Sequence, residues 1–464
     1  MKIIKMKVSI PDNIINDILL IVKELNKNGY ECYLIGGSVR DLVLGQAVSD
    51  FDFATNACPE EVARVFKRVI PTGIKHGTVT VLLREKQFEV TTYRFDGKYI
   101  DGRRPECVKF SKTLDEDVRR RDFTINGLGY DIHKEEIIDF VDGMEDLEKG
   151  IIKTIGDPLE RFGEDGLRSL RACRFAAKLN FEIEDETFNA ISKTLNISRL
   201  VSAERVRDEL IKLLFTDKPS IGFEYMRNSG LLKLFIPELY NCYKVNQNKY
   251  HLYDVYYHSL YSCDAVSRDN IMVRLAALFH DVGKVATREG ENDVDCTFYN
   301  HEVMGARLVK KLMIRLKFSN EEILEVTNLI VNHMFHYLDE WTDGAVRRFI
   351  KKVGLDNMDN LFLLRLADRI GNGMRKGIPA PINELKKRIE KIIKEENALN
   401  VKDLDIDGNI IMKEFDFKPG PLVGRLLNDL LEFVLDNPEM NEREILVSKS
   451  HEIYNKIGSE FQRD

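Results

Sequence analysis

Several features of exported and membrane proteins are missing from this sequence. No stretch approaches roughly eighteen uninterrupted apolar residues, and the N-terminal segment lacks an apolar core or a small-residue cleavage site. The seven cysteines are scattered, odd in number and never spaced as Cys-x-x-Cys. They therefore indicate reduced core residues rather than a disulfide framework or a zinc site. We expect a cytoplasmic protein without a membrane segment.

A strongly basic composition is absent too. Of the 464 residues, 44% are hydrophobic and 31% are charged, and the formal net charge is −7. This charge excludes a wholly basic nucleic-acid coat, whereas a local basic surface would still bind RNA. There is no repeat of fixed period and no low-complexity linker. The length predicts roughly two to four domains.

Strand and helix patterns mix in the first third of the chain, and helical pattern dominates after residue 156. The expected elements are a helix at 12–25, strands near 32–35 and 51–54, a helix at 59–69, and a hairpin of 78–84 with 87–93. We predict an α+β fold with a small mixed sheet in the head, followed by an extended all-α part. The expected divisions are a head at 1–155, a neck at 156–245, a metal-binding body at 246–380 and a tail at 381–464.

Two glycines and two aspartates form the most informative pattern. Gly36 and Gly37 follow the apolar run Cys32–Ile35, so we expect them at a strand-to-helix turn whose backbone amides face an anion. Asp50 and Asp52, at i and i+2, are expected on one face of a strand, where they would hold Mg²⁺. Alone, each half is more often a plain turn or a solvated edge. Together they indicate nucleotidyl transfer, in which two ions activate a hydroxyl and stabilise the leaving pyrophosphate.

Glu89 and a segment rich in glycine and charge follow. Glu89 lies in a strand pattern, where it is either a third metal carboxylate or general base, or an ordinary acid on an edge strand. Residues 96–106 have no periodicity, which predicts a mobile loop that gates or positions a phosphate.

A run of three arginines at 119–121 precedes Asp122 and Asn126. Such a run is normally a solvated patch, but the spacing of Asp122 and Asn126 is that of one helical face. We expect Arg121 to bind a triphosphate, Asp122 to accept from a ribose 2′-hydroxyl, and Asn126 to bind the sugar or a phosphate.

Residues 161–175 predict one helix with an apolar face and a charged face. The charged residues are either ordinary ion pairs or a device for reading bases. A carboxylate beside a guanidinium would pair with cytosine or adenine and would leave buried polar groups of uracil or guanine unpaired. We choose Asp165 and Arg168 for this pair, with Glu164 holding an arginine in place. The nucleotide-binding candidates are Gly37, Arg40, Arg121, Asp122, Asn126, Asp165, Arg168, Arg171 and Arg174.

Histidines are few, yet six of the nine lie between positions 251 and 336. A single histidine is more often a core or surface residue, whereas an ordered set on separate helices is typical of a shared divalent-metal pocket. Such a pocket would activate water for attack on a phosphoester. The ligand candidates are His258, His280, Asp281, His301, His333 and Asp368.

The motifs of the head and neck resemble those of polymerase-β-like nucleotidyltransferases, in particular class II tRNA nucleotidyltransferases (CCA-adding enzymes) and bacterial-type poly(A) polymerases. The resemblance rests on residues 36–52, 119–127, 161–175 and 204–210, the last similar to a supporting helix. Gly127 and Gly129 replace alanines that are usual in the second motif, which lowers helix propensity slightly. The resemblance implies a polymerase-β-like head.

The second half of the chain resembles another group. Residues 278–284 are similar to the signature of HD-superfamily phosphohydrolases, and His301-Glu302 with Gly305 resembles the helix that follows it. In HD-bearing tRNA nucleotidyltransferases this implies phosphatase, 2′-nucleotidase or 2′,3′-cyclic phosphodiesterase activity. Residues from about 380 onward resemble the tail of the same group. There, Pro421 either opens a helix whose amides bind a tRNA phosphate or marks a plain connection.

Residues and resemblance together predict template-independent addition or repair of the 3′-terminal CCA of tRNA from CTP and ATP. Mg²⁺ is expected in the head, and Mg²⁺ or a divalent transition metal at the HD site. A poly(A) polymerase, or an enzyme that adds only C or only A, is the alternative; the loop at 96–106 resembles an element associated with the final A. An HD hydrolase with a degenerate head and a non-catalytic RNA-binding protein are the options of other classes. The sequence does not predict the oligomeric state.

Overall fold

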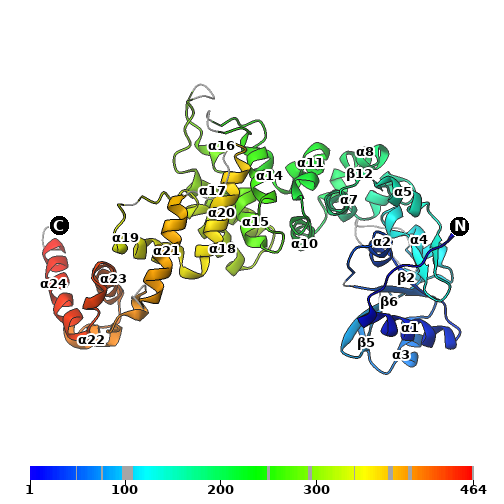
Figure 1. Cartoon of the computed structure of the whole chain (residues 1–464), viewed down its shortest axis with the longest axis horizontal. Coiled ribbons are helices and arrows are strands. Elements are labelled where there is room, and N and C mark those ends of the chain that lie inside the picture. The colour runs from blue at the N-terminus through cyan, green and yellow to red at the C-terminus, as the bar shows by residue number, and fades with distance from the viewer. Residues whose placement is uncertain are drawn as a thin grey trace. The chain divides into compact units, whose positions relative to one another are not determined.

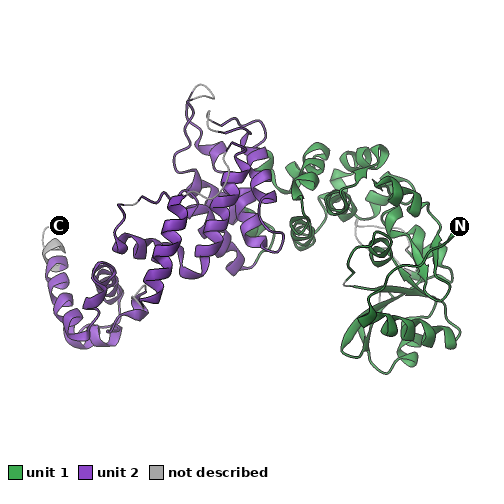
Figure 2. Ribbon diagram, viewed as in Figure 1, with its two compact units in different colours: residues 1–241, 312–318 green, residues 242–311, 319–464 purple. Residues whose placement is uncertain are grey.

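The computed structural model describes residues 1–48, 50–74, 77–96, 108–247, 251–290, 295–338, 340–374, 380–395 and 400–461. They form two units, which are coloured separately in Figure 2. The first comprises Met1–Asn241 with Leu312–Phe318, and the second comprises Cys242–Lys311 with Ser319–Asp464. The expected loop at 96–106 lies almost entirely outside the described residues.

One eight-stranded sheet organises the N-terminal part of the first unit (Figure 1). Its strands, in spatial order, are β1 (Lys2–Lys5), β10 (Glu136–Asp139), β9 (Gly129–Asp131), β2 (Cys32–Ile35), β3 (Asp52–Thr55), β6 (Lys86–Thr92), β5 (Thr78–Leu83) and β4 (Val69–Gly73). β3 and β6 run parallel, whereas the other neighbours in this sheet are antiparallel. The expected mixed sheet and the hairpin of β5 and β6 are confirmed.

Several helices accompany this sheet. They are α1 (Asp12–Lys27), α2 (Gly37–Val43), α3 (Pro59–Val65), α4 (Leu114–Arg119), a 3₁₀ helix (Thr124–Asn126) and α5 (Gly143–Lys149), and β7 (Arg94–Asp96) pairs with β8 (Val108–Phe110). The helix expected over 59–69 ends early. Phe66 adopts an extended backbone, and Val69 already pairs with Val81 of β5. Strand pairing with a β-branched partner therefore overrides the helical pattern.

The rest of the first unit is helical, with a small parallel pair of β11 (Ile151–Ile152) and β12 (Glu182–Ile183). The helices are α6 (Pro158–Glu164), α7 (Leu167–Leu179), α8 (Asp185–Lys193), α9 (Leu195–Ser198), α10 (Ala203–Leu214), α11 (Pro219–Ser229), α12 (Leu231–Phe235) and α13 (Pro237–Tyr240). Side by side, α7, α10 and α11 bury the apolar faces that the sequence pattern indicated.

The single helix expected over 161–175 is wrong, because the chain breaks between α6 and α7. Asp165 has an extended backbone (φ −144°, ψ 106°), and Gly166 lies against the backbone of another helix. A Cβ at Gly166 would lie 2.6 Å from Cα of Ser198. This close approach requires glycine, and the break places Asp165 outside both helices.

The second unit contains helices throughout. They are α14 (Val255–Asp264), α15 (Ile271–Phe279), α16 (Lys284–Thr287), α17 (His301–Arg315, which extends into the first unit), α18 (Asn320–Asn332), α19 (Asp343–Val353), α20 (Met358–Gly371), α21 (Ala380–Lys394), α22 (Gly408–Phe415), α23 (Pro421–Asp436) and α24 (Arg443–Phe461). Three 3₁₀ turns join them at Leu355–Asn357, Val401–Asp403 and Pro438–Met440. α14 packs against α15 and α20, and α23 packs against α22 and α24 around buried leucines.

The mixed sheet of the head and the helical body that follows it confirm the predicted α+β fold. Six of the seven cysteines lie in the described residues; all six are free thiols, and all but Cys58 are buried. Within the described part of the chain, no helix combines the length and apolar character needed to cross a membrane.

Candidate functional site

A turn of two glycines begins the candidate nucleotide site. β2 ends at Ile35 and α2 begins at Gly37, which confirms the expected strand–turn–helix. Gly36 has a φ of +80°, and a Cβ there would lie 3.3 Å from a guanidinium nitrogen of Arg121. Glycine is therefore required both by the left-handed backbone and by the close approach of Arg121.

Asp50, Asp52 and Glu89 are the candidate metal carboxylates of the head. Asp52 is the first residue of β3 and is directly opposite Glu89 of β6 in the parallel register. Asp50 precedes the strand, so the expectation that strand alternation aligns the two aspartates is wrong. Asp50 and Asp52 nevertheless line one cavity, whereas Glu89 is exposed and is adjacent to Asp52 only through the register.

The electrostatics of these carboxylates fit a divalent cation. Burial raises the pKa of Asp52 to about 6; Arg121 opposes this, while Glu89 and Asp50 add to it. Removal from water and the two neighbouring carboxylates therefore disfavour the ionised form of Asp52, and a bound cation would offset both effects. Hard oxygen donors of this kind are the ligands that Mg²⁺ prefers.

Asp122 and Asn126 are in contact, but not on one helix as expected. α4 ends at Arg119, and Asn126 lies in the separate 3₁₀ helix. Asn126 donates from Nδ2 to Asp122 Oδ1 (3.0 Å) and accepts at Oδ1 from Arg40 (2.5 Å). Arg40 is only 2% exposed, so it orients Asn126 from within the protein.

Asp122 is also held from the neck. Arg171 of α7 donates to Asp122 Oδ2 through Nε at 2.8 Å and Nη2 at 2.6 Å. Burial alone would raise the pKa of Asp122, but Arg171 and the hydrogen bond from Asn126 hold it well below its ordinary value. Asp122 is therefore ionised and acts as an acceptor at neutral pH.

The three arginines at 119–121 bind two different carboxylates. Arg120 and Arg121 both pair with the buried carboxylate of Asp117, and both line the cavity. Arg119 pairs instead with the partly exposed Asp115 on its own helix. Only the last two arginines of the run therefore face the candidate site.

Hydrogen bonds from neighbouring residues hold the side chains that are proposed to read the base. As predicted, Glu164 holds an arginine, because Arg168 Nη1 and Arg161 Nη1 both donate to it. Arg168 also donates from Nη2 to the backbone carbonyl of Arg120 (3.0 Å). Asp165 accepts from both terminal nitrogens of Arg205, at 3.1 and 2.6 Å.

Further along α7, Arg171 and Arg174 surround one aromatic ring. Their guanidinium carbons lie 5.2 and 4.1 Å from the ring centre of Phe175, and that of Arg40 lies 5.0 Å away. Glu209 of α10, which is 4% exposed, accepts from Nε of Arg174 at 2.5 Å. Stacking on the ring and pairing with Glu209 together orient these cations.

These groups surround a cavity of about 680 Å³ in the first unit. A cavity of this size accommodates a small-molecule ligand. All of the nucleotide-binding candidates line it. It is also lined by residues that the sequence interpretation did not select, among them Ser38, Asp41, Arg120, Phe175, Lys178, Arg205 and Lys212. Arg205 could have been selected from the sequence, because it lies in the motif at 204–210.

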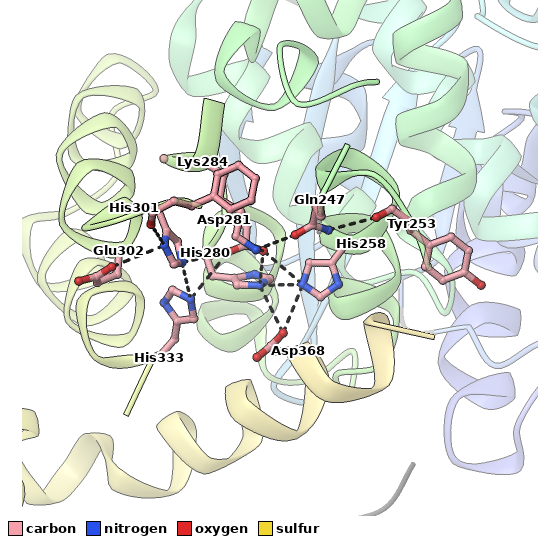
Figure 3. Close-up of polar contacts among 12 residues, drawn as sticks. Gln247, Tyr253, His258, His280, Asp281, Lys284, His301, Glu302, His333 and Asp368 are labelled. Carbon is pink, nitrogen blue, oxygen red and sulfur yellow. Dashed lines mark hydrogen bonds and ion pairs between the residues drawn. The ribbon is translucent and has the colours of Figure 1, made fainter. Parts of the chain in front are cut away.

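In the second unit, all six ligand candidates converge (Figure 3). His258 comes from α14, and Asp368 from α20. His280 ends α15 and is followed by Asp281, His301 begins α17, and His333 ends α18. In two overlapping groups, His258–His280–Asp368 and His280–Asp281–His333, the donor atoms lie within 4.8 Å of one another.

Burial and charge shape this cluster. Burial and the neighbouring His280 lower the pKa of His333 to about 3. Burial would also lower the pKa of His280, but Asp281 raises it above its ordinary value. Burial would raise the pKa of Asp281. The neighbouring His280 and Lys284 lower it by more, so the pKa of Asp281 lies well below its ordinary value. Buried imidazoles beside ionised carboxylates are the donor types that a divalent metal takes.

A second cavity of about 670 Å³ lies in front of the cluster. Lys284 donates to Asp281 Oδ2 and to Gln247 Oε1, at 2.6 Å each. The cavity is also lined by residues that the sequence interpretation did not assign to the site, among them His251, Lys284, Phe298, Tyr299, Phe335, His336, Tyr337, Arg365 and Arg369.

Comparison with protein families assigns the parts of the chain. The model of the Poly A polymerase head domain matches residues 32–153. The model of the probable RNA and SrmB-binding site of polymerase A matches residues 180–242, and that of the HD domain matches residues 249–373.

Individual relatives extend the similarity over nearly the whole chain. The CCA-adding enzyme of Ligilactobacillus salivarius is 31% identical over 446 residues, which are 96% of this chain and 98% of the relative. That of Lactobacillus johnsonii is 45% identical over 226 residues, 49% of this chain and 56% of the relative. The crystal structure of the Bacillus stearothermophilus CCA-adding enzyme in complex with CTP covers 97% of this chain and 100% of its own, with 26% identity and a TM-score of 0.72. The chain therefore belongs to the family of CCA-adding enzymes.

Proposed function

We propose that this protein builds or repairs the 3′-terminal CCA of tRNA from CTP and ATP without a nucleic-acid template. The observation that carries the proposal is one cavity of the first unit. The glycine turn, Asp50, Asp52 and the arginines of α7 all line it. No template strand is needed if the protein's own side chains choose the base.

The residues of the head would bind and orient the reactants. Asp50 and Asp52, with Glu89 beside them, would hold Mg²⁺, which supplies charge neutralisation and activation of the attacking hydroxyl. Gly37 and Arg121 would face the triphosphate. Asp122, kept ionised by Arg171, would accept a hydrogen bond from the ribose, while Arg40 keeps Asn126 in position.

Base choice is proposed for Asp165 and Arg168. A carboxylate oxygen accepts from the exocyclic amine of cytosine or adenine, and the guanidinium donates to the adjacent ring atom. Uracil and guanine present the opposite polarity and would leave buried groups unpaired, at a cost of about 1–3 kcal/mol each. Arg205 and Glu164 support the proposal because they orient one member of the pair each.

An assay with tRNA transcripts that lack zero to three 3′ nucleotides tests this function. The transcript lacking three nucleotides should acquire CCA only when CTP and ATP are both present. The transcript lacking one should acquire A, and the complete tRNA should not grow. Asp52→Ala should abolish every addition. A-tailing without a requirement for CTP would instead establish the poly(A) polymerase, and addition of A alone the partial enzyme.

A second activity is proposed for the second unit, namely metal-dependent hydrolysis of phosphoesters at RNA 3′ ends. It is supported by the convergence of four histidines and two aspartates in front of a cavity. Mg²⁺ or a divalent transition metal held there would activate water. Lys284, Arg365 and Arg369 would add positive charge toward a phosphate.

Hydrolysis of a 2′,3′-cyclic phosphate at the end of an RNA tests this second activity. It should be lost in His280→Ala and Asp281→Ala and survive in Asp50→Ala and Asp52→Ala, whereas CCA addition should show the opposite pattern. Absence of hydrolysis with Mg²⁺, Mn²⁺, Ni²⁺ and Co²⁺ alike would refute it.

Three further expectations are kept as proposals. The chain is divided at residues 155, 245 and 380 into head, neck, body and tail. The tail at 381–464 binds tRNA, for which α23, beginning at Pro421, offers a helix N-terminus. The protein works in the cytoplasm.

A further inference from the structure

We propose that Asp117 is a positioning residue of the nucleotide site, which orients Arg120 and Arg121 toward the triphosphate and acts only through them. The inference rests on the first function proposed above. It gives a role to a residue that the sequence pattern did not select and that is not among the residues lining the cavity.

One carboxylate holds both arginines. Asp117 lies in the last turn of α4, and its side chain is completely buried. Its Oδ1 accepts from Nε and Nη2 of Arg120, at 2.9 and 2.7 Å. Its Oδ2 accepts from Nε and Nη2 of Arg121, at 3.2 and 3.0 Å. Each oxygen therefore binds one edge of a guanidinium group through charge-assisted hydrogen bonds.

The spacing along the chain explains why a single aspartate reaches both arginines. Residues three and four positions after Asp117 return to its side of a helix. Although α4 ends at Arg119, Arg120 still has helical backbone angles (φ −85°, ψ −9°), so the turn continues toward Arg121. The pair of Asp115 and Arg119 has the same i,i+4 spacing, but it is partly exposed, and neither residue is among those lining the cavity.

The other ends of the two guanidinium groups are left for a ligand. Asp117 binds the edge formed by Nε and Nη2, and each guanidinium has further N–H groups on Nη1 and Nη2. Nη1 of Arg121 lies at the glycine turn, because a Cβ at Gly36 would be 3.3 Å from it. Arg120, Arg121 and this turn all line the cavity. The position that Asp117 gives to Arg121 is therefore next to the backbone amides that are expected to face the triphosphate.

The fold fixes Asp117 itself. The backbone N–H of Arg94, the first residue of β7, donates to Asp117 Oδ1 at 3.3 Å. Burial would raise the pKa of Asp117, but Arg121 and Arg120 lower it below its ordinary value, so the group is ionised at neutral pH. Because the carboxylate belongs to α4 and is also bound by β7, it can orient the arginines before a ligand arrives.

Positioning and charge predict opposite effects of this residue on phosphate binding. The negative charge of Asp117 repels a polyphosphate, so by Coulomb's law alone its removal should tighten binding. Arginines that are already ordered lose less conformational entropy when a ligand binds, so loss of the residue that orders them should weaken binding. The sign of the change in affinity therefore distinguishes the two.

The test is calorimetry on the full-length protein without tRNA. It measures the Kd of CTP in Mg²⁺ and the Kd of inorganic tripolyphosphate as a competitor of CTP. Asp117→Asn keeps the shape of the side chain and removes its charge, and both Kd values should rise by about 10- to 100-fold. The matched control on the same helix, Asp115→Asn, should leave both within about twofold, because exposed ion pairs contribute little.

Nucleotide-addition kinetics separate this role from base choice. In Asp117→Asn the KM values for CTP and ATP should rise by the same factor, because the triphosphate is common to both. The preference for CTP over UTP should stay unchanged. A change in this preference without a rise in KM would contradict the proposed role.

The remaining outcomes are also decisive. An equal or lower Kd of tripolyphosphate in folded Asp117→Asn would overturn the positioning role and leave the proposed CCA addition intact. A parent protein that binds no CTP would refute the proposed function and this inference together. If thermal unfolding shows that Asp117→Asn does not fold, Asp117→Glu replaces it, because it keeps the charge and displaces the carboxylate by one methylene. Its Kd values should also rise, and unchanged values would overturn the proposal.

Discussion

Arg205 donates to both oxygens of Asp165, at 3.1 and 2.6 Å, from a helix forty positions further along the chain. The planar guanidinium forms two parallel hydrogen bonds, which fix the carboxylate in rotation as well as in position. An aspartate that reads a base must present its oxygens in one orientation. Arg205 is therefore expected to affect fidelity through the orientation of Asp165.

Substitution of Arg205 tests this relationship. Arg205→Ala removes charge-assisted hydrogen bonds of about 1.5–3 kcal/mol, so kcat/KM for CTP should fall by about 10- to 100-fold. Arg205→Lys keeps the charge but not the parallel geometry, and its kcat/KM should be intermediate. Misincorporation of UTP should rise in both. Single-nucleotide addition kinetics measure these effects, and the exposed Arg199→Ala provides the control. An unchanged ratio of CTP to UTP in Arg205→Ala would contradict the role.

Asp52 should make the metal-free protein less stable as pH rises. Its pKa is raised from 3.8 to about 6 by burial and the neighbouring carboxylates, so between these values the folded state binds more protons than the unfolded state. Stability contributed by the protonated carboxyl is present at low pH and lost as pH rises through 6. Asp52→Asn should therefore stabilise the protein at pH 8, by at most about 3 kcal/mol, and have little effect at pH 4.

Urea unfolding in EDTA at the two pH values measures this difference, with the partly exposed Asp115→Asn as the control. Mg²⁺ should restore stability to the unaltered protein more than to Asp52→Asn, because binding to the folded state shifts the equilibrium. Equal destabilisation of Asp52→Asn at both pH values would show that Asp52 is not held in this environment.

Two glycines of the neck offer a matched pair of substitutions. At Gly166 an alanine Cβ would lie 2.6 Å from the backbone of Ser198, so Gly166→Ala should destabilise the protein by about 1–3 kcal/mol. At Gly163, in α6, no atom lies within 4 Å of such a Cβ, and alanine should stabilise by up to about 1 kcal/mol. Thermal unfolding compares the two. Because Gly166 adjoins Asp165, Gly166→Ala should also lower CCA addition, whereas Gly163→Ala should not.

Lys284 provides a variant that separates the two proposed activities. Lys284→Met removes the donor to Asp281 and Gln247, leaving two buried acceptors without it, at a cost of about 1–3 kcal/mol. Phosphoester hydrolysis should fall by about 10- to 100-fold, while CCA addition should stay within twofold. Parallel assays of both reactions check this, with the exposed Lys310→Met on α17 as the control. Hydrolysis at the original rate would remove Lys284 from the mechanism.

The sequence pattern predicted the structure correctly where residues close together in the chain determine it. The run Cys32–Ile35 followed by two glycines predicted β2, the turn and α2 correctly. The ordered set of histidines and aspartates predicted which residues converge in the second unit, and His258, His280, His301 and His333 lie on or at the ends of four separate helices.

Contacts between distant segments could not be predicted in the same way. The apolar spacing of Leu167 and Leu170 continues the helical pattern of α6, and only the backbone of Ser198 explains the break at Gly166. The pairing of Asp165 with Arg205, and the orientation of Asn126 by Arg40, likewise join segments far apart in the chain. Charged residues have many potential partners, so the sequence shows that Arg205 is available but not which carboxylate it binds.

The hydrogen bond from Arg168 to the carbonyl oxygen of Arg120 has a consequence for how such enzymes diverge. Every amino acid carries that oxygen, proline included, so this acceptor would persist whichever residue stood at position 120. The Arg120 side chain, which pairs with Asp117 and lines the cavity, limits variation at that position for separate reasons. The hydrogen bond itself would be disturbed only by a change that moves the backbone between α4 and the following 3₁₀ turn.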